Sequence, residues 1–209
     1  MLNIINISGF MNIASGVLLL AYWYLYAILM PYRQLSTSLS LLVLNKHWTF
    51  VNLLGAIGAL LGIVGLVGLF MTMEGDLGKF GSLGFILALL GSILMFSAIL
   101  RDTLVWPILA KHDPTLLDFN GPIYTSKTFL PFFIISGLFY AAGFVLFGLA
   151  IADSSYYPKA AGMLLVWGVP LFGMGAMFGQ WQVYPRTVGM TALSIGLIWI
   201  GNMMRINLF

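Results

Sequence analysis

Cysteine is absent from this chain, and charge is scarce. Its 209 residues include no Cys, and only 7% are Asp, Glu, Lys or Arg. Without cysteine there can be no disulfide, no cysteine-ligated zinc or iron–sulfur site and no thiol nucleophile. The few charged residues all lie in the gaps between apolar runs. Because an ionisable group in hydrocarbon is costly and usually functional, this pattern argues against a proton relay, an ion ladder or a buried catalytic cluster.

The sequence also lacks the short motifs that mark common catalytic and nucleotide-binding sites. It contains no H-E-x-x-H, no G-x-S-x-G, no G-x-x-x-x-G-K and no pair of carboxylates within an apolar run. Ser92, Ser97 and Ser136 lie in apolar runs, but no base stands at a suitable spacing from any of them. No catalytic residue is therefore assigned, and a non-enzymatic protein is favoured.

Apolar sequence fills most of the chain, since 61% of the residues are hydrophobic. A membrane-spanning helix needs about 20 consecutive, mostly apolar residues. Six such runs predict an all-α integral membrane bundle of six transmembrane helices, in a single polytopic domain that covers residues 1–209. The predicted spans are residues 10–30, 48–73, 80–100, 128–152, 160–180 and 187–204.

Basic residues are distributed unevenly between the two sets of loops. The connections after the first, third and fifth spans carry Arg33, Lys46, Arg101, Lys111, Lys127 and Arg186, whereas the opposite side carries Lys79, Lys159 and Arg205. Cytoplasmic loops are enriched in Lys and Arg, so both termini are predicted on the outer side. A multi-pass position in a prokaryotic cytoplasmic (inner) membrane is expected. Because the basic residues form no cluster, no nucleic-acid partner is expected.

Glycines recur on one face of the second predicted span, and at 100° per residue they fall within an arc of about 140°. These glycines are Gly55, Gly58, Gly62, Gly65 and Gly68. A glycine face lets another helix backbone approach closely, and Gly175 and Gly179 repeat the theme in the fifth span. Three interpretations are open: packing inside the bundle, a docking face for another membrane chain or a second copy, and a slot for a flat apolar ligand such as a carotenoid or quinone.

A candidate polar site lies at the inner edge of the bundle. Arg101 is 21 residues after Phe80, or about 32 Å along a helix, so its side chain is expected to reach the inner headgroups. Adjacent residues on a helix do not face each other, so Arg101 and Asp102 are not expected to pair. With His112 and Asp118 they form a possible site for anionic headgroups or a substrate. The alternative is an arginine that extends to lipid phosphate beside an ordinary solvated loop.

The two histidines, His47 and His112, both lie at the predicted inner edge. A stacked pair of haems inside the bundle is therefore not expected. No cofactor is predicted. The sequence leaves one pigment arrangement open, a single haem or chlorophyll with one axial ligand at His47 or at His112. No metal site is predicted either, because Lys111 and Pro114 place His112 in an ordinary loop.

Three functional hypotheses follow. The leading one is a non-enzymatic, accessory or structural subunit embedded in the lipid bilayer. It would pack by its glycine faces against other membrane chains or a second copy of itself. The second is a transporter or binder of a small neutral or lipidic molecule, with Gly168, Pro170 and Gly173 marking a broken helix beside a cavity. The third is an intramembrane enzyme with its site near the inner edge, at Arg101, Asp102, His112 and Asp118.

Overall fold

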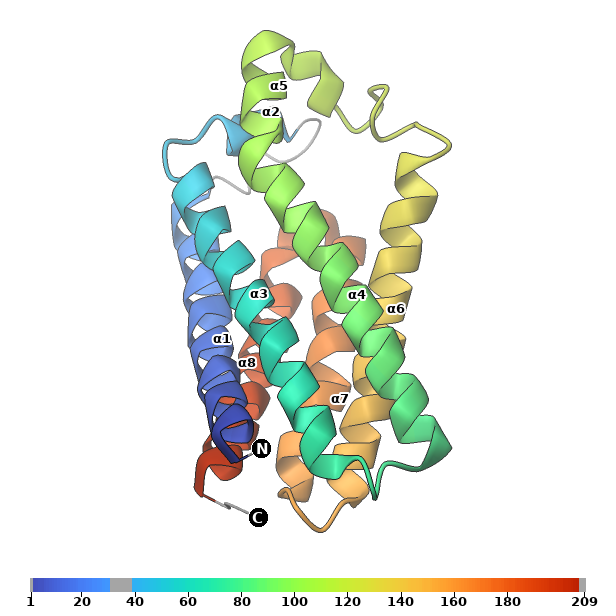
Figure 1. The fold of residues 1–209 in the computed structure, drawn as a ribbon. Coiled ribbons are helices and arrows are strands. Elements are labelled where there is room, and N and C mark those ends of the chain that lie inside the picture. Colours follow the sequence, from blue (N-terminus) through green and yellow to red (C-terminus); the bar gives the residue numbers. More distant parts are fainter. Residues whose placement is uncertain (1, 31–38, 207–209) are drawn as a thin grey trace.

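The computed structural model describes residues 2–30 and 39–206, and within these ranges every regular element is a helix (Figure 1). Five helices, counting α4 with the adjoining α5, are long and apolar enough to cross a membrane. These helices are α1 (Leu2–Leu29), α3 (Trp48–Met73), α4 (Gly78–Leu104) with α5 (Trp106–His112), α6 (Phe129–Asp153) and α8 (Val183–Ile206). The shorter elements are α2 (Ser40–Val43), η2 (Pro114–Leu117), α7 (Lys159–Met174) and η3 (Gly175–Trp181).

Two of the predicted spans differ from the observed helices in an informative way. The first helix begins at Leu2 and not near residue 10, because its polar residues pack inside the bundle. The fifth predicted span, 160–180, is an α-helix only as far as Met174 and continues as the 3-10 helix η3. Pro170 lies inside α7 without ending it, so the expected break at this proline is wrong.

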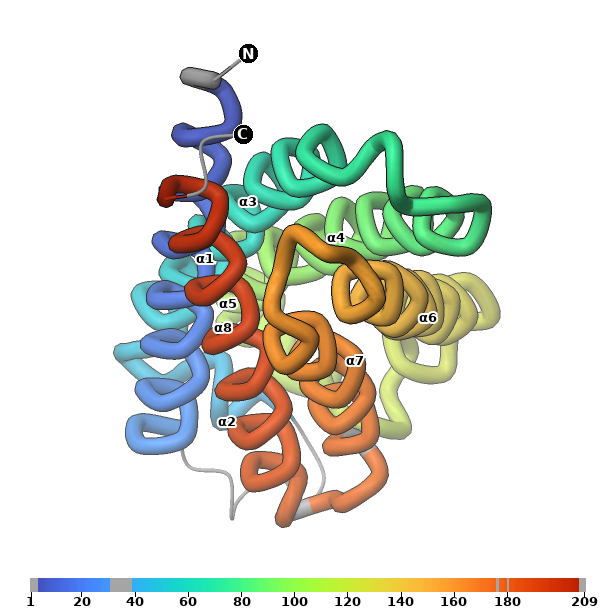
Figure 2. The backbone as a smooth tube through the Cα atoms, turned by 90° about the horizontal axis from the view of Figure 1, so that it is seen from below, coloured from blue at the N-terminus to red at the C-terminus, as the bar shows by residue number. Residues whose placement is uncertain are grey.

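The six longer helices form a closed ring, which Figure 2 shows from below. Each helix packs against two neighbours, in the order α1, α3, α4, α6, α7 and α8, and α8 returns to α1. Successive helices run in opposite directions, so the first residues of α1 and the last residues of α8 lie at the same end (Figure 1). This up-and-down ring makes the six longer helices one bundle around a central axis.

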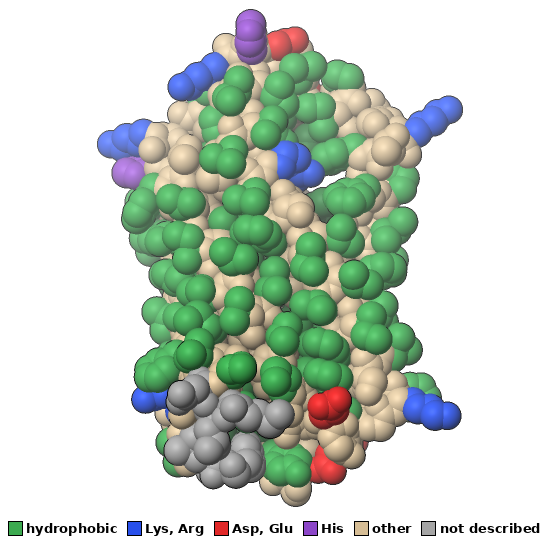
Figure 3. All heavy atoms as spheres, in the orientation of Figure 1, with side chains coloured by type: hydrophobic (Ala, Val, Ile, Leu, Met, Phe, Trp, Pro, Cys, Tyr) green, Lys and Arg blue, Asp and Glu red, His purple; other side chains and the backbone are tan. Residues whose placement is uncertain are grey.

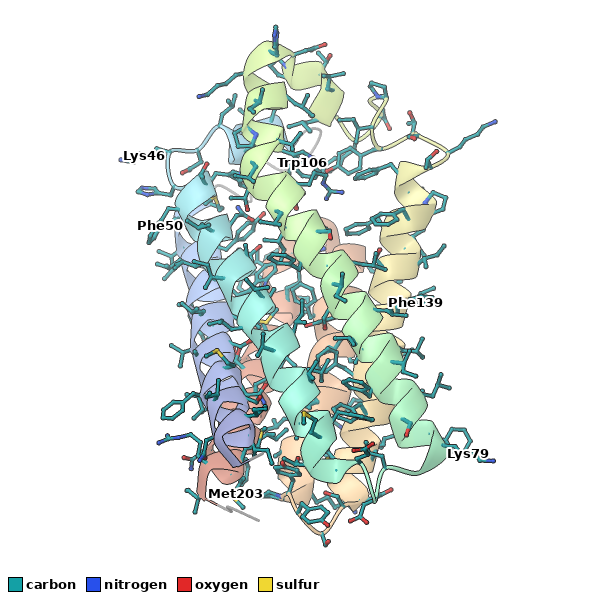
Figure 4. The ribbon with its side chains drawn as sticks, in the orientation of Figure 1. Lys46, Phe50, Lys79, Trp106, Phe139 and Met203 are labelled. Atoms are coloured by element: carbon teal, nitrogen blue, oxygen red, sulfur yellow. The ribbon has the colours of Figure 1, made fainter. Side chains whose placement is uncertain are left out.

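Charged side chains lie at the two ends of the bundle, and hydrophobic side chains cover the face between them in Figure 3. In Figure 4, Lys46 and Lys79 mark opposite ends, whereas Phe50 and Phe139 project outward between them. Phe50 is 57% exposed and Phe139 is 36% exposed. Such an extended apolar belt is unfavourable in water and is the surface expected against lipid. Arg33, one of the basic residues used for the topology, lies outside the described residues.

The glycine stripe of α3 packs against α1 of the same chain. A Cβ atom at Gly55 would lie 3.0 Å from the Tyr22 ring, and one at Gly62 would lie 2.7 Å from Ser15 Oγ. The other three glycines, Gly58, Gly65 and Gly68, face Leu18 and Leu19, Asn12 and Ser8 in the same way. Because α1 covers the stripe, the five glycines pack within the bundle, as the first of the three interpretations has it, and a docking face for another chain stays a prediction.

The two glycines predicted in the fifth span have different roles. A Cβ at Gly175 would clash with the side chain of Arg186, so this glycine permits close packing against α8. Gly179 has a φ of +51°, and no heavy atom of the described residues lies within 4 Å of a Cβ built on it. Among the described residues, Gly179 therefore makes no close contact with a neighbouring helix of the kind predicted. Its role is conformational, because L residues rarely adopt this backbone geometry.

Glycine also allows close approach at the other contacts of the ring. Gly148 faces Gly162 between α6 and α7, and Gly168 faces Gly189 between α7 and α8. A Cβ at any of these four positions would lie 2.9 Å or less from a backbone atom of the neighbouring helix. Small residues at such contacts increase van der Waals packing, which lipid cannot supply between helices.

Candidate ligand cavity

The ring of helices encloses a cavity of about 310 Å³, and all six of the longer helices contribute to its wall. On α1 the lining runs from Ser15 to Tyr26, and on α8 it runs from Arg186 to Leu197. Each of these intervals is 11 residues, or about 16 Å along a helix axis. The cavity therefore extends from the middle of the bundle to the end that carries α5.

The wall of the cavity is mainly apolar. Leucine, methionine and aromatic side chains form most of it, including Leu19, Leu66, Met95, Phe144 and Leu197. Gly137 on α6 and Gly173 on α7 also line it, and a Cβ built on either would meet no heavy atom of the described residues within 4 Å. An apolar cavity of this size falls in the range used by proteins for small-molecule ligands, roughly 300–1,000 Å³.

Polar groups of the wall are linked into a chain at the α5 end. The Tyr22 hydroxyl donates to Asn52 Oδ1 at 3.3 Å, and Asn52 Nδ2 donates to the Trp48 carbonyl oxygen at 2.9 Å. Trp48 Nε1 in turn donates to the backbone carbonyl of Asp102 at 2.8 Å. This chain joins α1, α3 and α4, and it holds four cavity-lining residues in fixed positions.

Arg186 brings a cation to the same end of the cavity. It lies in the first turn of α8, with its Cζ 5.9 Å from the centre of the Trp23 ring and 5.7 Å from that of Phe172. All three residues line the cavity. A guanidinium at this distance from aromatic faces is stabilised by cation–π attraction.

No family model matches this chain, and neither a curated protein nor a solved structure does.

Arg101 and Asp102 form an ion pair, contrary to the expectation from their positions on a helix. Arg101 Nη2 and Nε donate to Asp102 Oδ1 at 2.6 and 2.9 Å. The arginine side chain is long enough to curl back along its own helix, so adjacency on α4 does not prevent the pairing. The guanidinium also lies 4.7 Å from the Trp106 ring and 4.8 Å from the Phe129 ring. Arg101 is therefore held against the first residues of α5 and α6, and its contact with lipid headgroups stays a prediction.

Of the four residues of the predicted polar site, one lines the cavity. Asp102 lines it, but His112 is exposed at the end of α5, and Asp118 follows η2 in the loop. His47, the other possible axial ligand, precedes α3, and its backbone N–H donates to Asn45 Oδ1 at 2.9 Å. Among the described residues, no group of three or more His, Asp or Glu side chains is placed to hold a metal ion.

Several residues of the cavity were not predicted as functional. Tyr22 and Trp23 are typical of interfacial anchors by sequence, and Arg186 is typical of a loop cation, yet all three line the cavity. One signal was available: Ser15, Leu19, Tyr22 and Tyr26 recur at intervals of three and four residues, so they share one face of α1.

The cavity opens to the side between α4 and α6. The two helices pack closely where Gly143 meets Ala88, and they diverge toward the α5 end. Four consecutive residues in the first half of α6 are exposed: Phe132, Phe133, Ile134 and Ile135. Consecutive positions point around most of the helix, so neighbouring helices cover this part of α6 only in part. Phe133 and Ile134 also line the cavity, and Figure 3 shows an opening in the surface between α4 and α6 at this level.

Proposed function

We propose that this protein is a membrane-embedded binding protein that takes an amphiphilic small molecule from the bilayer into its central cavity. One observation carries the proposal: a largely apolar cavity of about 310 Å³ within a ring of helices, with its charged side chains at one end and an opening toward the lipid-facing side. A hydrophobic molecule with one polar group matches this division of the wall. The side opening offers a path that avoids water.

The structure also weakens the support for the other two hypotheses. The subunit hypothesis rested on the glycine stripe of α3, and α1 covers that stripe. The enzyme hypothesis required Arg101, Asp102, His112 and Asp118 to act together, but only Asp102 lines the cavity. Ligand binding is therefore the function that the geometry supports best.

The proposal includes six membrane crossings with both termini outside. The hydrocarbon core is about 30 Å thick. The 16 residues of α7 give about 24 Å at 1.5 Å per residue, and the four residues of η3 that precede the kink at Gly179 add about 8 Å at 2.0 Å per residue. Together they are long enough to cross. The excess of Lys and Arg at the α5 end favours a cytoplasmic location for that end.

Filling the cavity tests the proposal. Gly137 and Gly173 line the cavity, and a Cβ at either meets no heavy atom of the described residues within 4 Å, so we expect leucine there to occupy cavity space without displacing backbone. We expect Gly137→Leu and Gly173→Leu to fold with at least wild-type stability, because glycine in a helix is unfavourable by roughly 0.5–1 kcal/mol relative to alanine. Both should bind an uncharged naphthylamine fluorophore more weakly than the wild type in lipid nanodiscs.

Gly75→Leu is the matched control. Gly75 lies in the exposed turn between α3 and α4, and it too has open space around a Cβ. This variant adds the same side chain away from the cavity, so its fluorophore binding should equal that of the wild type. Equal binding by all four proteins, or no binding above that of empty nanodiscs, would refute the proposed function.

A further inference from the structure

We infer that the ligand of the cavity is a single-chain amphiphile with a monoanionic head, and that the head lies at the α5 end beside Trp23 and Arg186. This inference rests on the proposed function and specifies the chemistry of its ligand. A long-chain carboxylate is the simplest molecule of this class.

A buried hydrogen-bond donor lies in the cavity wall beside the proposed head of the ligand. Trp23 is 4% exposed and lines the cavity, and among the described residues no acceptor pairs with its Nε1. Indole nitrogen is a donor only. A buried polar group without a partner is unfavourable, and a ligand acceptor would relieve that penalty. The head group must therefore accept hydrogen bonds.

The charged side chains at the α5 end are two arginines and one aspartate. Asp102 is neutralised by Arg101, to which it is bonded at 2.6 Å. Arg186 adds a further positive charge to the wall. The formal charges of these three side chains sum to +1, which favours a ligand with one negative charge at this end. A cationic head would meet repulsion, and a dianion would leave an excess of negative charge in a poorly solvated site.

The two ends of the cavity have different linings. Its charged side chains, Asp102 and Arg186, lie at the α5 end. Leu19, Leu66 and Leu197 line the part nearer the middle of the bundle, together with the Ser15 and Ser92 hydroxyls. An amphiphile with its head beside Arg186 would therefore place its chain along this apolar wall, over a length of about 16 Å. The opening between α4 and α6 lies at the level of the head, so the head can enter from the headgroup region of the bilayer.

Competition among ligands of equal chain length tests the inference. The full chain in nanodiscs of phosphatidylcholine is loaded with the naphthylamine fluorophore, and dodecanoate, dodecanol, dodecylamine and dodecyl phosphate are added in turn. The pH is set so that the carboxylate is ionised, and empty nanodiscs correct for partition into lipid. Dodecanoate should displace the fluorophore at a concentration roughly tenfold or more below that of dodecanol, as expected for a charge-assisted hydrogen bond.

Two variants assign the preference to named side chains. Arg186→Gln should weaken dodecanoate binding roughly tenfold and leave dodecanol within about twofold of the wild type. Trp23→Phe keeps a ring but removes the donor, so it should weaken dodecanoate by a smaller factor. Lys159→Gln removes the same charge as Arg186→Gln from an exposed site at the opposite end. It should change neither ligand.

The outcomes separate the inference from the proposed function. Equal displacement by dodecanoate and dodecanol, or stronger displacement by dodecylamine or dodecyl phosphate, would overturn the monoanionic head while ligand binding stands. If the fluorophore does not bind the protein and no ligand changes its signal, the proposed function itself fails. The ligand series uses the wild-type protein, so the test remains decisive even if Arg186→Gln does not fold.

Discussion

Trp48 Nε1 donates a hydrogen bond of 2.8 Å to the backbone carbonyl oxygen of Asp102, which joins the first residue of α3 to the last turn of α4. Trp48 is 2% exposed. The bond continues a chain that runs from Tyr22 through Asn52, so three helices are held together where the cavity is polar. Trp48 therefore positions the wall of the candidate site.

Replacing Trp48 by Phe should destabilise the protein. The substitution keeps an aromatic ring but leaves the Asp102 carbonyl without this donor. A buried hydrogen bond contributes about 1 kcal/mol, so the free energy of unfolding should fall by about 1–2 kcal/mol with the loss of packing included. Thermal unfolding in detergent measures the change. Trp181→Phe is the control, because Trp181 is 59% exposed and its substitution should change stability by less than about 0.5 kcal/mol.

Gly65→Leu should destabilise the fold without changing the oligomeric state. A side chain at Gly65 would meet Asn12 of α1, whose Nδ2 donates to the Gly65 carbonyl oxygen at 3.1 Å. Overpacking a tight contact costs about 1–3 kcal/mol. Unfolding and light scattering should be measured on the same samples, with Gly75→Leu as the control. Loss of a dimer at unchanged stability would show instead that the stripe joins two chains.

The sequence predicts the helices well where apolar runs are clearly bounded. The second span, Trp48–Met73, matches α3 at both ends, because a loop and an acidic turn limit it. The start of α1 was missed because Ser8 and Asn12 reduce the apolar character of the run. Both are buried, and Ser8 is accommodated only by Gly68 of another helix. A contact between distant residues therefore decides where α1 begins.

The cavity was harder to predict because lipid-facing and inward-facing residues are both apolar. In a soluble protein, periodicity distinguishes the buried face of a helix from the solvated face. Here Tyr24 is 47% exposed and Tyr22 is buried, although both are tyrosines near the same helix end. The pairing of Arg101 with Asp102 depends on the conformation of one side chain, which spacing along a helix does not reveal.

Cysteine labelling should place the two loop systems on opposite sides of the membrane. The chain has no cysteine of its own, so a single substitution gives one labelling site. Thr115→Cys lies beside α5 and Ser155→Cys lies between α6 and α7, and both native side chains are exposed. A membrane-impermeant maleimide applied to intact cells should label position 155, whereas position 115 should react only after permeabilisation. Labelling of both from one side would contradict the six-span arrangement.

Stability should fall at high pH through Tyr157, which lies in the loop between α6 and α7. Burial raises the pKa of Tyr157 to about 12, although its hydrogen bond with Thr72 acts in the opposite direction. The unfolded pKa is about 10. The folded state therefore retains the proton longer, and its contribution to stability is complete below about pH 10 and is lost as the pH rises toward 12.

The Tyr157→Phe variant isolates this effect. Its unfolding midpoint should be lower than that of the wild type at neutral pH, because the bond to Thr72 is lost. The decline between pH 10 and 12 should be shallower by up to about 2–3 kcal/mol. Tyr184→Phe, at a 61% exposed tyrosine, is the control and should preserve the wild-type pH profile. Parallel pH profiles for wild type and Tyr157→Phe would contradict the assignment.

The Arg101–Asp102 pair should be coupled energetically, and a double-mutant cycle measures that coupling. Arg101→Met removes the cation that lies over Trp106 and Phe129 and leaves Asp102 with its charge in the cavity wall. Asp102→Asn removes the matching anion. The side chains are 23% and 25% exposed, so we expect each single variant to lose about 1–2 kcal/mol of stability, less than for a fully buried pair.

The double variant should lose less than the sum of the two single losses, because neither charge then lacks its partner. Lys111→Met, an exposed cation on α5, is the control and should leave stability unchanged. Strict additivity in the cycle would mean that the pair does not hold α4, α5 and α6 together at the mouth of the cavity.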